Sequence, residues 1–202
     1  MDVSSLHPWR KEIQETTIAP KNGFKKLCIA YVRRGEDCVD FVETILSFSI
    51  GMGFMLYFSY GSFLDSETLK RHCPKAIYKG MAMLPNWEVQ FNFLSRTYAG
   101  GVTGIEPAAA KLVRGVLYEV NDEELLHLDS IEGVSEGIYY RQTIYVVNEL
   151  GKAVKAATYR TTNPKGPFKP TKRYVGLMIK GAKEHGLDND YVKELEAIET
   201  VD

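Results

Sequence analysis

MLYFSYGS, residues 55–62, is a short apolar and aromatic run that ends at a glycine and a serine. This pattern predicts a buried strand at residues 55–60 and a tight turn at Gly61. A cap at Asp65 or Ser66 then starts a short helix. A strand, a turn and a helix in this order are a frequent place for function, because a rigid element there presents a loop.

The turn at Gly61 and Ser62 has two interpretations. In the first, successive backbone N–H groups beside the start of a helix hold a carboxylate or a developing oxyanion, helped by the helix dipole. In the second, the turn is only structural, with Gly61 supplying the dihedral angle and Ser62 the cap. The local sequence alone favours the structural interpretation, because such turns are common.

The rest of the chain carries a series of strand signals. Alternating or aromatic apolar runs predict strands, and the last two of them pair across Gly151 as a hairpin. The predicted strands are residues 77–83, 89–94, 111–120, 139–147 and 153–161. Pro85 and Asn86 predict a turn between the first two, and the glycines between residues 100 and 104 predict a loop. We therefore expect a mostly antiparallel sheet.

Helix caps define the remaining predicted elements. Asn121 caps a helix that ends at Gly133, a residue suited to the left-handed conformation that closes helices. A closing helix follows at residues 171–185, and residues 190–198 form a short, charged amphipathic helix. Strands and helices are mixed along the chain, and the fold class is therefore α+β.

The first part of the chain has weaker organisation than the rest. Residues 25–32 predict a short strand, and residues 40–48 predict a helical turn or two. The best strand signal begins only after this part. We therefore divide the chain into an N-terminal extension, residues 1–53, and a domain, residues 54–202.

Length, charge and cysteine content restrict the function. With 202 residues, the chain is long enough for one main globular domain. Its formal charge of −1 provides no broad basic field, so we expect no nucleic-acid partner. The three cysteines fit neither a disulfide framework nor a Cys-x-x-Cys metal site, and a reducing cytoplasm suits them best. The four histidines lack a second ligand at helical spacing, so we expect no metal.

An uncharged stretch at residues 44–64 is long enough to suggest a transmembrane helix. Serines and glycines dilute this stretch, and half of it fits a strand and a turn better. Residues 1–26 are polar and mixed in charge, unlike a secretory signal. We therefore expect no membrane partner.

Glu132 occupies an electrostatically unfavourable position. It is the last residue before Gly133, so its carboxylate faces the negative end of the helix dipole. This location raises the pKa of the carboxylate, and a glutamate with a pKa closer to neutrality is suited to general base catalysis. The other interpretation is a solvated glutamate at a frayed helix end, which the position alone favours.

Three segments occur in a characteristic order along the chain. They are Tyr57-Phe58-Ser59-Tyr60-Gly61-Ser62, Gly115-Val116-Leu117-Tyr118-Glu119-Val120 and Leu128-Asp129-Ser130-Ile131-Glu132-Gly133-Val134. Together they resemble the γ-glutamylcyclotransferase family. The similarity continues through Gly137-Ile138-Tyr139 and residues 180–187, and it covers residues 55–198 in outline.

The resemblance implies a small β-barrel-like fold with flanking helices, no metal or organic cofactor, and often a homodimer. It implies an enzyme that converts γ-glutamyl amides into 5-oxoproline and a free amine, with the α-amino group of the substrate as the nucleophile. By position, Glu132 matches the catalytic acid/base. The implied substrate-binding residues are Tyr57, Phe58, Ser59, Tyr60, Gly61 and Ser62, whose backbone holds the glutamyl group, and the pocket residues Tyr139 and Tyr174.

Phe63 departs from the family pattern, which has asparagine after Tyr-Gly-Ser. A phenyl ring cannot make the hydrogen bonds of an amide, and this affects the choice of substrate more than the reaction. Three alternatives stay open: an enzyme for a γ-glutamylamine, an enzyme for glutathione, and a module that binds a γ-glutamyl ligand without turnover.

Overall fold

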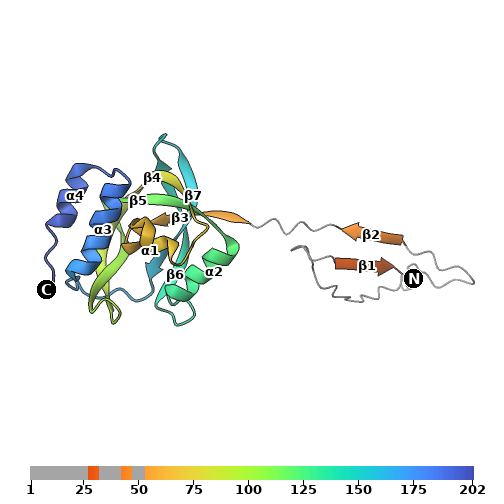
Figure 1. Ribbon diagram of the computed structural model, residues 1–202, viewed down its shortest axis with the longest axis horizontal. Coiled ribbons are helices and arrows are strands. Elements are labelled where there is room, and N and C mark those ends of the chain that lie inside the picture. The colour runs from red at the N-terminus through yellow and green to blue at the C-terminus, as the bar shows by residue number, and fades with distance from the viewer. Residues whose placement is uncertain (1–26, 32–41, 47–52) are drawn as a thin grey trace, which may run out of the picture. The chain divides into compact units, whose positions relative to one another are not determined.

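The computed structural model describes residues 27–31, 42–46 and 53–202 (Figure 1). The chain divides into two units, residues 1–52 and 53–202. The described part of the first unit is a pair of antiparallel strands, β1 (Leu27–Tyr31) and β2 (Val42–Leu46).

The β1–β2 pair confirms one prediction and corrects another. The strand predicted at residues 25–32 contains β1, but the helix predicted at residues 40–48 is wrong, because β2 is a strand. Val42, Thr44 and Ile45 are β-branched and favour an extended backbone, and each lies opposite a residue of β1.

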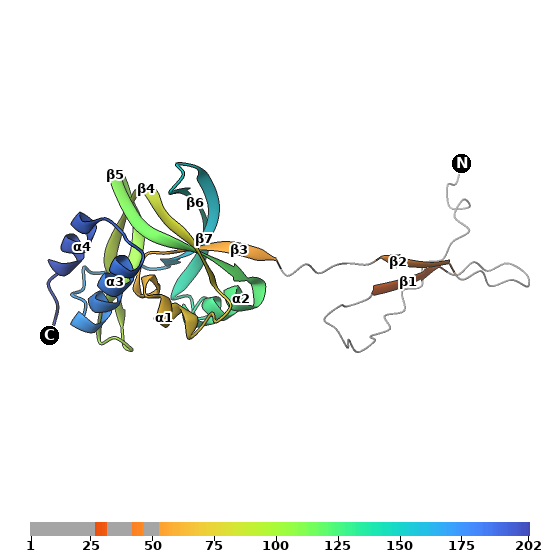
Figure 2. The ribbon, with the colours of Figure 1, turned by 45° about the horizontal axis from the view of Figure 1, so that its top comes forward.

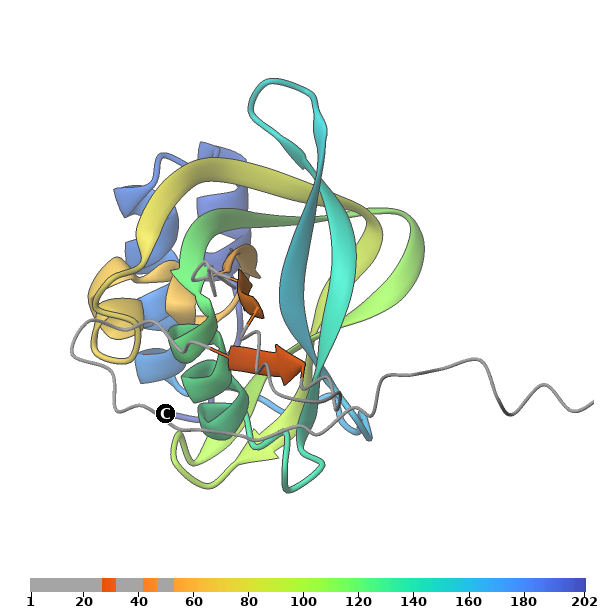
Figure 3. The same cartoon turned by 90° about the vertical axis from the view of Figure 1, so that its right-hand side faces the viewer.

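The second unit is a closed five-stranded barrel with flanking helices. Its strands are β3 (Phe54–Ser59), β4 (Ile77–Ser95), β5 (Gly100–Asn121), β6 (Tyr139–Asn148) and β7 (Ala153–Thr161). They follow the order β3-β5-β4-β6-β7, and Figure 3 shows them curving around a common interior. All pairs are antiparallel except the closing pair, in which β3 runs parallel to β7. The α+β class and the mostly antiparallel barrel are thus confirmed.

One long strand, β4, replaces the two strands predicted on either side of Pro85 and Asn86. The predicted turn is instead a bulge, where the register shifts between Pro85 and Trp87 and Asn86 has a φ of 62°. The chain can therefore pass these residues without leaving the sheet, and the irregularity adds twist.

The loop predicted at the glycines is also wrong, because Gly100, Gly101 and Gly104 belong to β5. The actual turn between β4 and β5 is residues 96–99. A Cβ on Gly101 would lie 2.3 Å from the carbonyl oxygen of Phe168, and one on Gly104 would lie 2.3 Å from Asn92 Oδ1. These glycines thus permit close packing.

Two helices begin at the predicted caps, Asp65 and Asn121. A 3-10 turn, η1 (Ser62–Leu64), precedes α1 (Ser66–Lys70), which Asp65 caps. The others are α2 (Asp122–Ile131), capped by Asn121, α3 (Lys172–Glu184), capped by Thr171, and α4 (Asn189–Glu196), capped by Asp188. Figure 2 shows α3 and α4 packed together on one side of the barrel. In the described part of the chain, no helix combines the length and apolar character required to cross a membrane.

The alternation of β3 divides its side chains between two cores. Tyr57 belongs to the core between the strands and the helices, which includes Leu128 of α2 and Met178 of α3. Phe58 belongs to the core formed by strands and the adjoining Tyr60. Successive strand residues point to opposite faces, so β3 presents its odd-numbered residues toward the helices.

Candidate active site

A cavity of about 790 Å³ opens at the end of β3. Its walls come from β3, η1, α1, the adjoining ends of β4 and β5 with the turn between them, the end of α2, the start of β6, β7 and the first turn of α3. The cavity brings together the following predicted site residues: Tyr57, Ser59, Tyr60, Gly61, Ser62, Glu132, Tyr139 and Tyr174. Phe58 is the exception, because its ring is fully buried in the other core and does not line the cavity.

The turn after β3 presents unused backbone donors to the cavity. The N–H of Leu64 donates to Gly61 O at 3.0 Å, and that of Asp65 donates to Ser62 O at 3.3 Å. Within the described part of the chain, the N–H groups of Gly61, Ser62 and Phe63 have no acceptor. Neighbouring N–H groups without protein partners form a site for an anion.

Crowding requires a glycine at position 61. Its φ of −113° is negative, but its ψ of −138° lies outside the main β and α regions. A Cβ at this position would lie 2.5 Å from Thr103 Oγ1 and 3.0 Å from the hydroxyl of Tyr174. A purely structural interpretation of the turn is therefore incomplete. Because Gly61 has no side chain, Thr103 and Tyr174 of the cavity wall can approach its backbone.

Glu132 lies at the C-terminal end of α2 and reaches the cavity. Its N–H donates to Leu128 O at 2.9 Å, and Gly133 follows with a φ of 65°, which ends the helix as predicted. Burial raises the pKa of Glu132 to about 7. The predicted direction of the shift is thus found, but desolvation in the cavity wall is its cause.

Five tyrosines surround Glu132. They are Tyr57, Tyr60, Tyr139, Tyr159 and Tyr174. Burial raises the pKa of each phenol, and the charge of Glu132 adds to the rise. All five therefore stay protonated near neutral pH and can donate hydrogen bonds.

Thr103 holds two of these tyrosines, and no sequence pattern pointed to it. The hydroxyl of Tyr139 donates to Thr103 O at 3.0 Å. The N–H of Thr103 donates to the hydroxyl of Tyr174 at 3.2 Å, and Thr103 Oγ1 lies 2.7 Å from the same hydroxyl. Thr103 lies between the glycines that predict a loop, so the sequence pattern did not indicate that it belongs to a strand, β5.

Sequence reasoning missed further cavity residues. Phe93 and Arg96 come from the end of β4 and the turn after it, and Arg96 is the one lysine or arginine in the cavity wall. Phe63 also lines the cavity, with its ring centroid 5.7 Å from that of His72. The cavity thus combines one carboxylate, one guanidinium and several aromatic rings.

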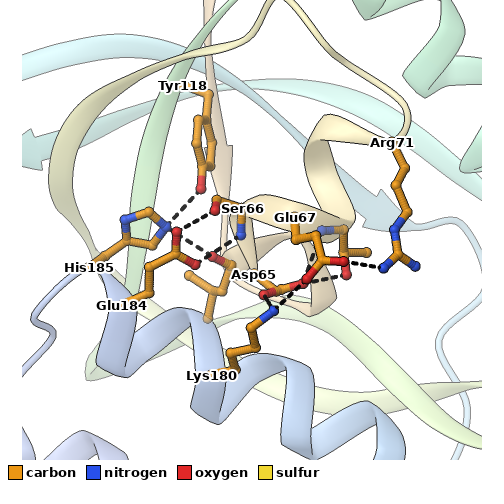
Figure 4. A network of polar contacts seen from close by, with 10 residues as sticks. Asp65, Ser66, Glu67, Arg71, Tyr118, Lys180, Glu184 and His185 are labelled. Atoms are coloured by element: carbon orange, nitrogen blue, oxygen red, sulfur yellow. Dashed lines mark hydrogen bonds and ion pairs between the residues drawn. The ribbon is translucent and has the colours of Figure 1, made fainter.

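The turn after β3 is fixed to α3 by a polar network (Figure 4). Lys180 Nζ lies 2.8 Å from Oδ1 of the buried Asp65, and His185 Nε2 lies 3.1 Å from Leu64 O. Behind them, a Cβ on Gly181 would lie 2.1 Å from the carbonyl carbon of Leu64. The segment at residues 180–187 therefore supports the turn from behind.

The described residues contain no group of three histidine, cysteine, aspartate or glutamate side chains placed to bind a metal. The cavity wall instead offers a carboxylate with a raised pKa beside an array of donors. This arrangement suits proton transfer next to an oxygen that gains charge.

Comparison with known proteins links this site to one family. A model of the AIG2-like family matches residues 112–195. The γ-glutamylcyclotransferase of Bos taurus is 33% identical over 151 residues, which cover 73% of this chain and 80% of the relative. The enzyme of the same name from Homo sapiens is 33% identical over the same shares of the two chains.

A solved structure of a gamma-glutamyl cyclotransferase has the same fold. It superimposes with a TM-score of 0.72 at 32% sequence identity, over 74% of this chain and 90% of the other. The similarity therefore includes both the barrel and the elements that form the cavity.

Proposed function

The chain belongs to the γ-glutamylcyclotransferase family, and on this basis we propose that it converts γ-glutamyl amino acids into 5-oxoproline and the free amino acid. It is an enzyme of the lyase class, as its relatives are. One observation carries the assignment to this cavity: Glu132, with a pKa of about 7, lines the same cavity as the unused N–H groups of the turn after β3.

The reaction needs few groups because the substrate supplies its own nucleophile. The α-amino nitrogen attacks the γ-carbonyl carbon, and a five-membered lactam forms. Holding the glutamyl chain in a folded pose makes this attack intramolecular and gives it a high effective concentration. The main task of the protein is therefore to fix that pose.

Glu132 acts in the proposal as base and then as acid. Its carboxylate takes a proton from the attacking amine, and the electrons of the γ-carbonyl move onto oxygen. When the intermediate collapses, the bond to the leaving nitrogen breaks and Glu132 returns the proton to that nitrogen. A pKa of about 7 suits both the step in which Glu132 accepts the proton and the step in which it donates it, because neither protonation state is strongly preferred at neutral pH.

The N–H groups of Gly61, Ser62 and Phe63 are proposed to bind the α-carboxylate of the substrate. They lack protein acceptors in the described residues, and their backbone is fixed from behind by α3. A rigid anion site at this end of the glutamyl group leaves the γ-carbonyl free to reach Glu132.

Arg96 favours a substrate with a second carboxylate. It is the one cation in the cavity wall, and the carboxylate of the departing amino acid is a suitable partner. A γ-glutamylamine has no such group. Phe63 and Phe93 give the remaining wall an apolar character, which suits an apolar amino-acid side chain.

The experiment measures 5-oxoproline release from γ-glutamyl dipeptides by the wild type and by Glu132→Gln. We expect kcat to fall by about 10²–10⁴-fold in the variant, because an amide cannot take the proton. Glu136→Gln is the matched control, since Glu136 is exposed and lies outside the cavity. Equal turnover in all three proteins would remove Glu132 from the mechanism.

The proposal also includes the setting of the enzyme. Residues 1–53 are an extension, residues 54–202 form the catalytic domain, and the protein acts in the cytoplasm as a homodimer. The free thiol of Cys73, buried in the core, is consistent with a reducing compartment. Sedimentation analysis tests the dimer, and a chain that begins at Met55 tests the extension.

A further inference from the structure

Four of the five tyrosines around Glu132 use their hydroxyls in bonds within the protein. Tyr60 donates to Tyr159 O at 2.7 Å, and Tyr159 donates to Asp129 Oδ1 at 2.7 Å. Tyr139 and Tyr174 are bound to Thr103. These hydroxyls position the rings and are poorly placed to serve a ligand.

Tyr57 differs from the other four. In the described part of the chain its hydroxyl bonds to no other element and lies beside the hydroxyl of Ser59, although the side chain is only 5% exposed and lines the cavity. Its ring is fixed, since it packs edge-on against Tyr159 with the centroids 5.9 Å apart. A phenol hydroxyl that faces a cavity and bonds to no other element can donate to a ligand bound there.

Ser59 is the second unused hydroxyl on the same face of β3. It lies two residues after Tyr57, lines the same cavity and is 1% exposed. Its Oγ has no hydrogen-bond partner among the described residues, although it is near enough to Tyr57 to oppose the rise in the pKa of that phenol. Two neighbouring hydroxyls of β3 thus face the cavity, and among the described residues neither bonds to another element.

We propose that Tyr57 is a catalytic hydrogen-bond donor to the γ-carbonyl oxygen of the substrate, and that Ser59 is a positioning residue that directs the hydroxyl of Tyr57. This inference rests on the proposed function. The Tyr57 side chain lines the same cavity as Glu132 and is near enough to be influenced by its charge, which supports a role at the carbonyl whose carbon is under attack.

The step balances without proton transfer to or from Tyr57. As the amine nitrogen bonds to the γ-carbon, the carbonyl electrons move onto oxygen, and the Tyr57 O–H bond stays intact while its hydrogen bond to that oxygen strengthens. Burial and the charge of Glu132 raise the pKa of Tyr57 well above its usual value, so the proton stays on the phenol. The backbone N–H groups at residues 61–63 then remain available to the α-carboxylate.

Tyr57→Phe tests the role, because it removes the hydroxyl and keeps the ring. We expect kcat to fall by about 10²-fold or more, with KM changed only a few-fold, because the donor acts mainly on the transition state. Tyr191→Phe is the matched control, since its buried hydroxyl has no partner among the described residues and lies outside the cavity. A Tyr57→Phe enzyme with wild-type kcat would overturn the inference.

A substrate with sulfur in place of the γ-carbonyl oxygen identifies the atom that Tyr57 contacts. Sulfur is a weak acceptor, so the loss caused by Tyr57→Phe should be much smaller with the thioamide than with the amide. Equal losses with both substrates would contradict a bond to this oxygen.

Ser59→Ala provides an independent check. We expect a smaller drop in kcat, about 5-fold, with KM unchanged, and no further loss when it is added to Tyr57→Phe. Additive losses would contradict the role of Ser59. If Glu132→Gln abolishes turnover while Tyr57→Phe does not, this inference fails and the proposed function stands. If the wild type releases no 5-oxoproline, the proposed function itself fails.

Discussion

Thr103 Oγ1 lies 2.7 Å from the hydroxyl of Tyr174, and the N–H of Thr103 donates to the same hydroxyl at 3.2 Å. One threonine thus fixes a cavity tyrosine through both its side chain and its backbone. Because Tyr139 also donates to Thr103 O, two walls of the cavity depend on this residue of β5.

Thr103→Val should loosen Tyr174 while keeping the backbone bonds of the strand. We expect the free energy of unfolding to fall by about 1 kcal/mol, the usual net value of one hydrogen bond, and KM to rise. Thr103→Ser restores the hydroxyl and should recover KM. Thermal unfolding and steady-state kinetics measure the two effects. If Thr103→Ser restored neither the stability nor KM, the assigned role of the hydroxyl would be contradicted.

The pH dependence of turnover should reflect Glu132. Its carboxylate must be ionised to accept the proton of the amine, and burial raises its pKa to about 7. We therefore expect kcat/KM to increase with pH and to level off above about pH 7. A profile that is already flat from pH 5 upward would show that another group takes the proton.

The same shift has an opposite consequence for stability. Between the ordinary glutamate pKa of 4.5 and the folded value of about 7, the folded chain keeps a proton that the unfolded chain releases. Stability therefore falls as the pH rises through this window, and the penalty is fully present above it. Glu132→Gln removes the penalty, so its Tm should exceed that of the wild type at pH 8 but not at pH 4. Equal differences at both pH values would contradict the burial of the charge.

Arg96→Ala should separate two classes of substrate. We expect KM for γ-glutamylalanine to rise by about tenfold, while γ-glutamylethylamide, which lacks the carboxylate, is unaffected. Arg173→Ala is the control. It also removes one arginine, but Arg173 does not line the cavity and lies over the ring of Tyr98. Equal effects of Arg96→Ala on both substrates would count against recognition of the carboxylate.

Lys180→Met should disturb the turn that holds the glutamyl group. It leaves the buried Asp65 without its cation, so the backbone at residues 61–64 loses part of its support. We expect kcat/KM to drop by about tenfold and the Tm to decrease. Lys183→Met is the control on the same helix, because Lys183 pairs with Glu196, a glutamate that is exposed. Equal Tm losses in both variants would contradict the special role of Asp65.

Local sequence signals were sufficient to predict an element where a single residue determines its start or its turn. Asp65, Asn121 and Thr171 each cap a helix by accepting a backbone N–H, and this chemistry acts within one turn. The hairpin of β6 and β7 likewise follows from alternation and from Gly151, which has a φ of 71°. These elements were predicted with nearly correct bounds.

The predictions were wrong where contacts between residues far apart in the sequence determine the local structure. Gly101 and Gly104 have the composition of a loop, but Phe168 and Asn92 press against them, and no local rule reveals those neighbours. Phe58 was grouped with the site because it is within the motif, although the alternation of a strand directs it away from Tyr57. The role of Thr103 is not predicted because it lies between these glycines, in the segment that the composition assigns to a loop.

The resemblance, rather than the position in a helix, is the basis for proposing Glu132 as the acid/base. Its location at the end of α2 indicated a raised pKa through the helix dipole, while the structure shows desolvation as the cause. Burial of that carboxylate depends on tyrosines from β3, β6, β7 and α3, which only the closed barrel brings together.

The parallel pair of β3 and β7 closes the barrel, and β3 also carries the turn that faces the cavity. During synthesis, this strand leaves the ribosome about a hundred residues before its partner and well before Tyr174. A chain that ends before β7 therefore lacks part of the cavity wall and the strand that closes the barrel. We therefore expect release of product to report that the whole domain, from β3 to α3, has folded.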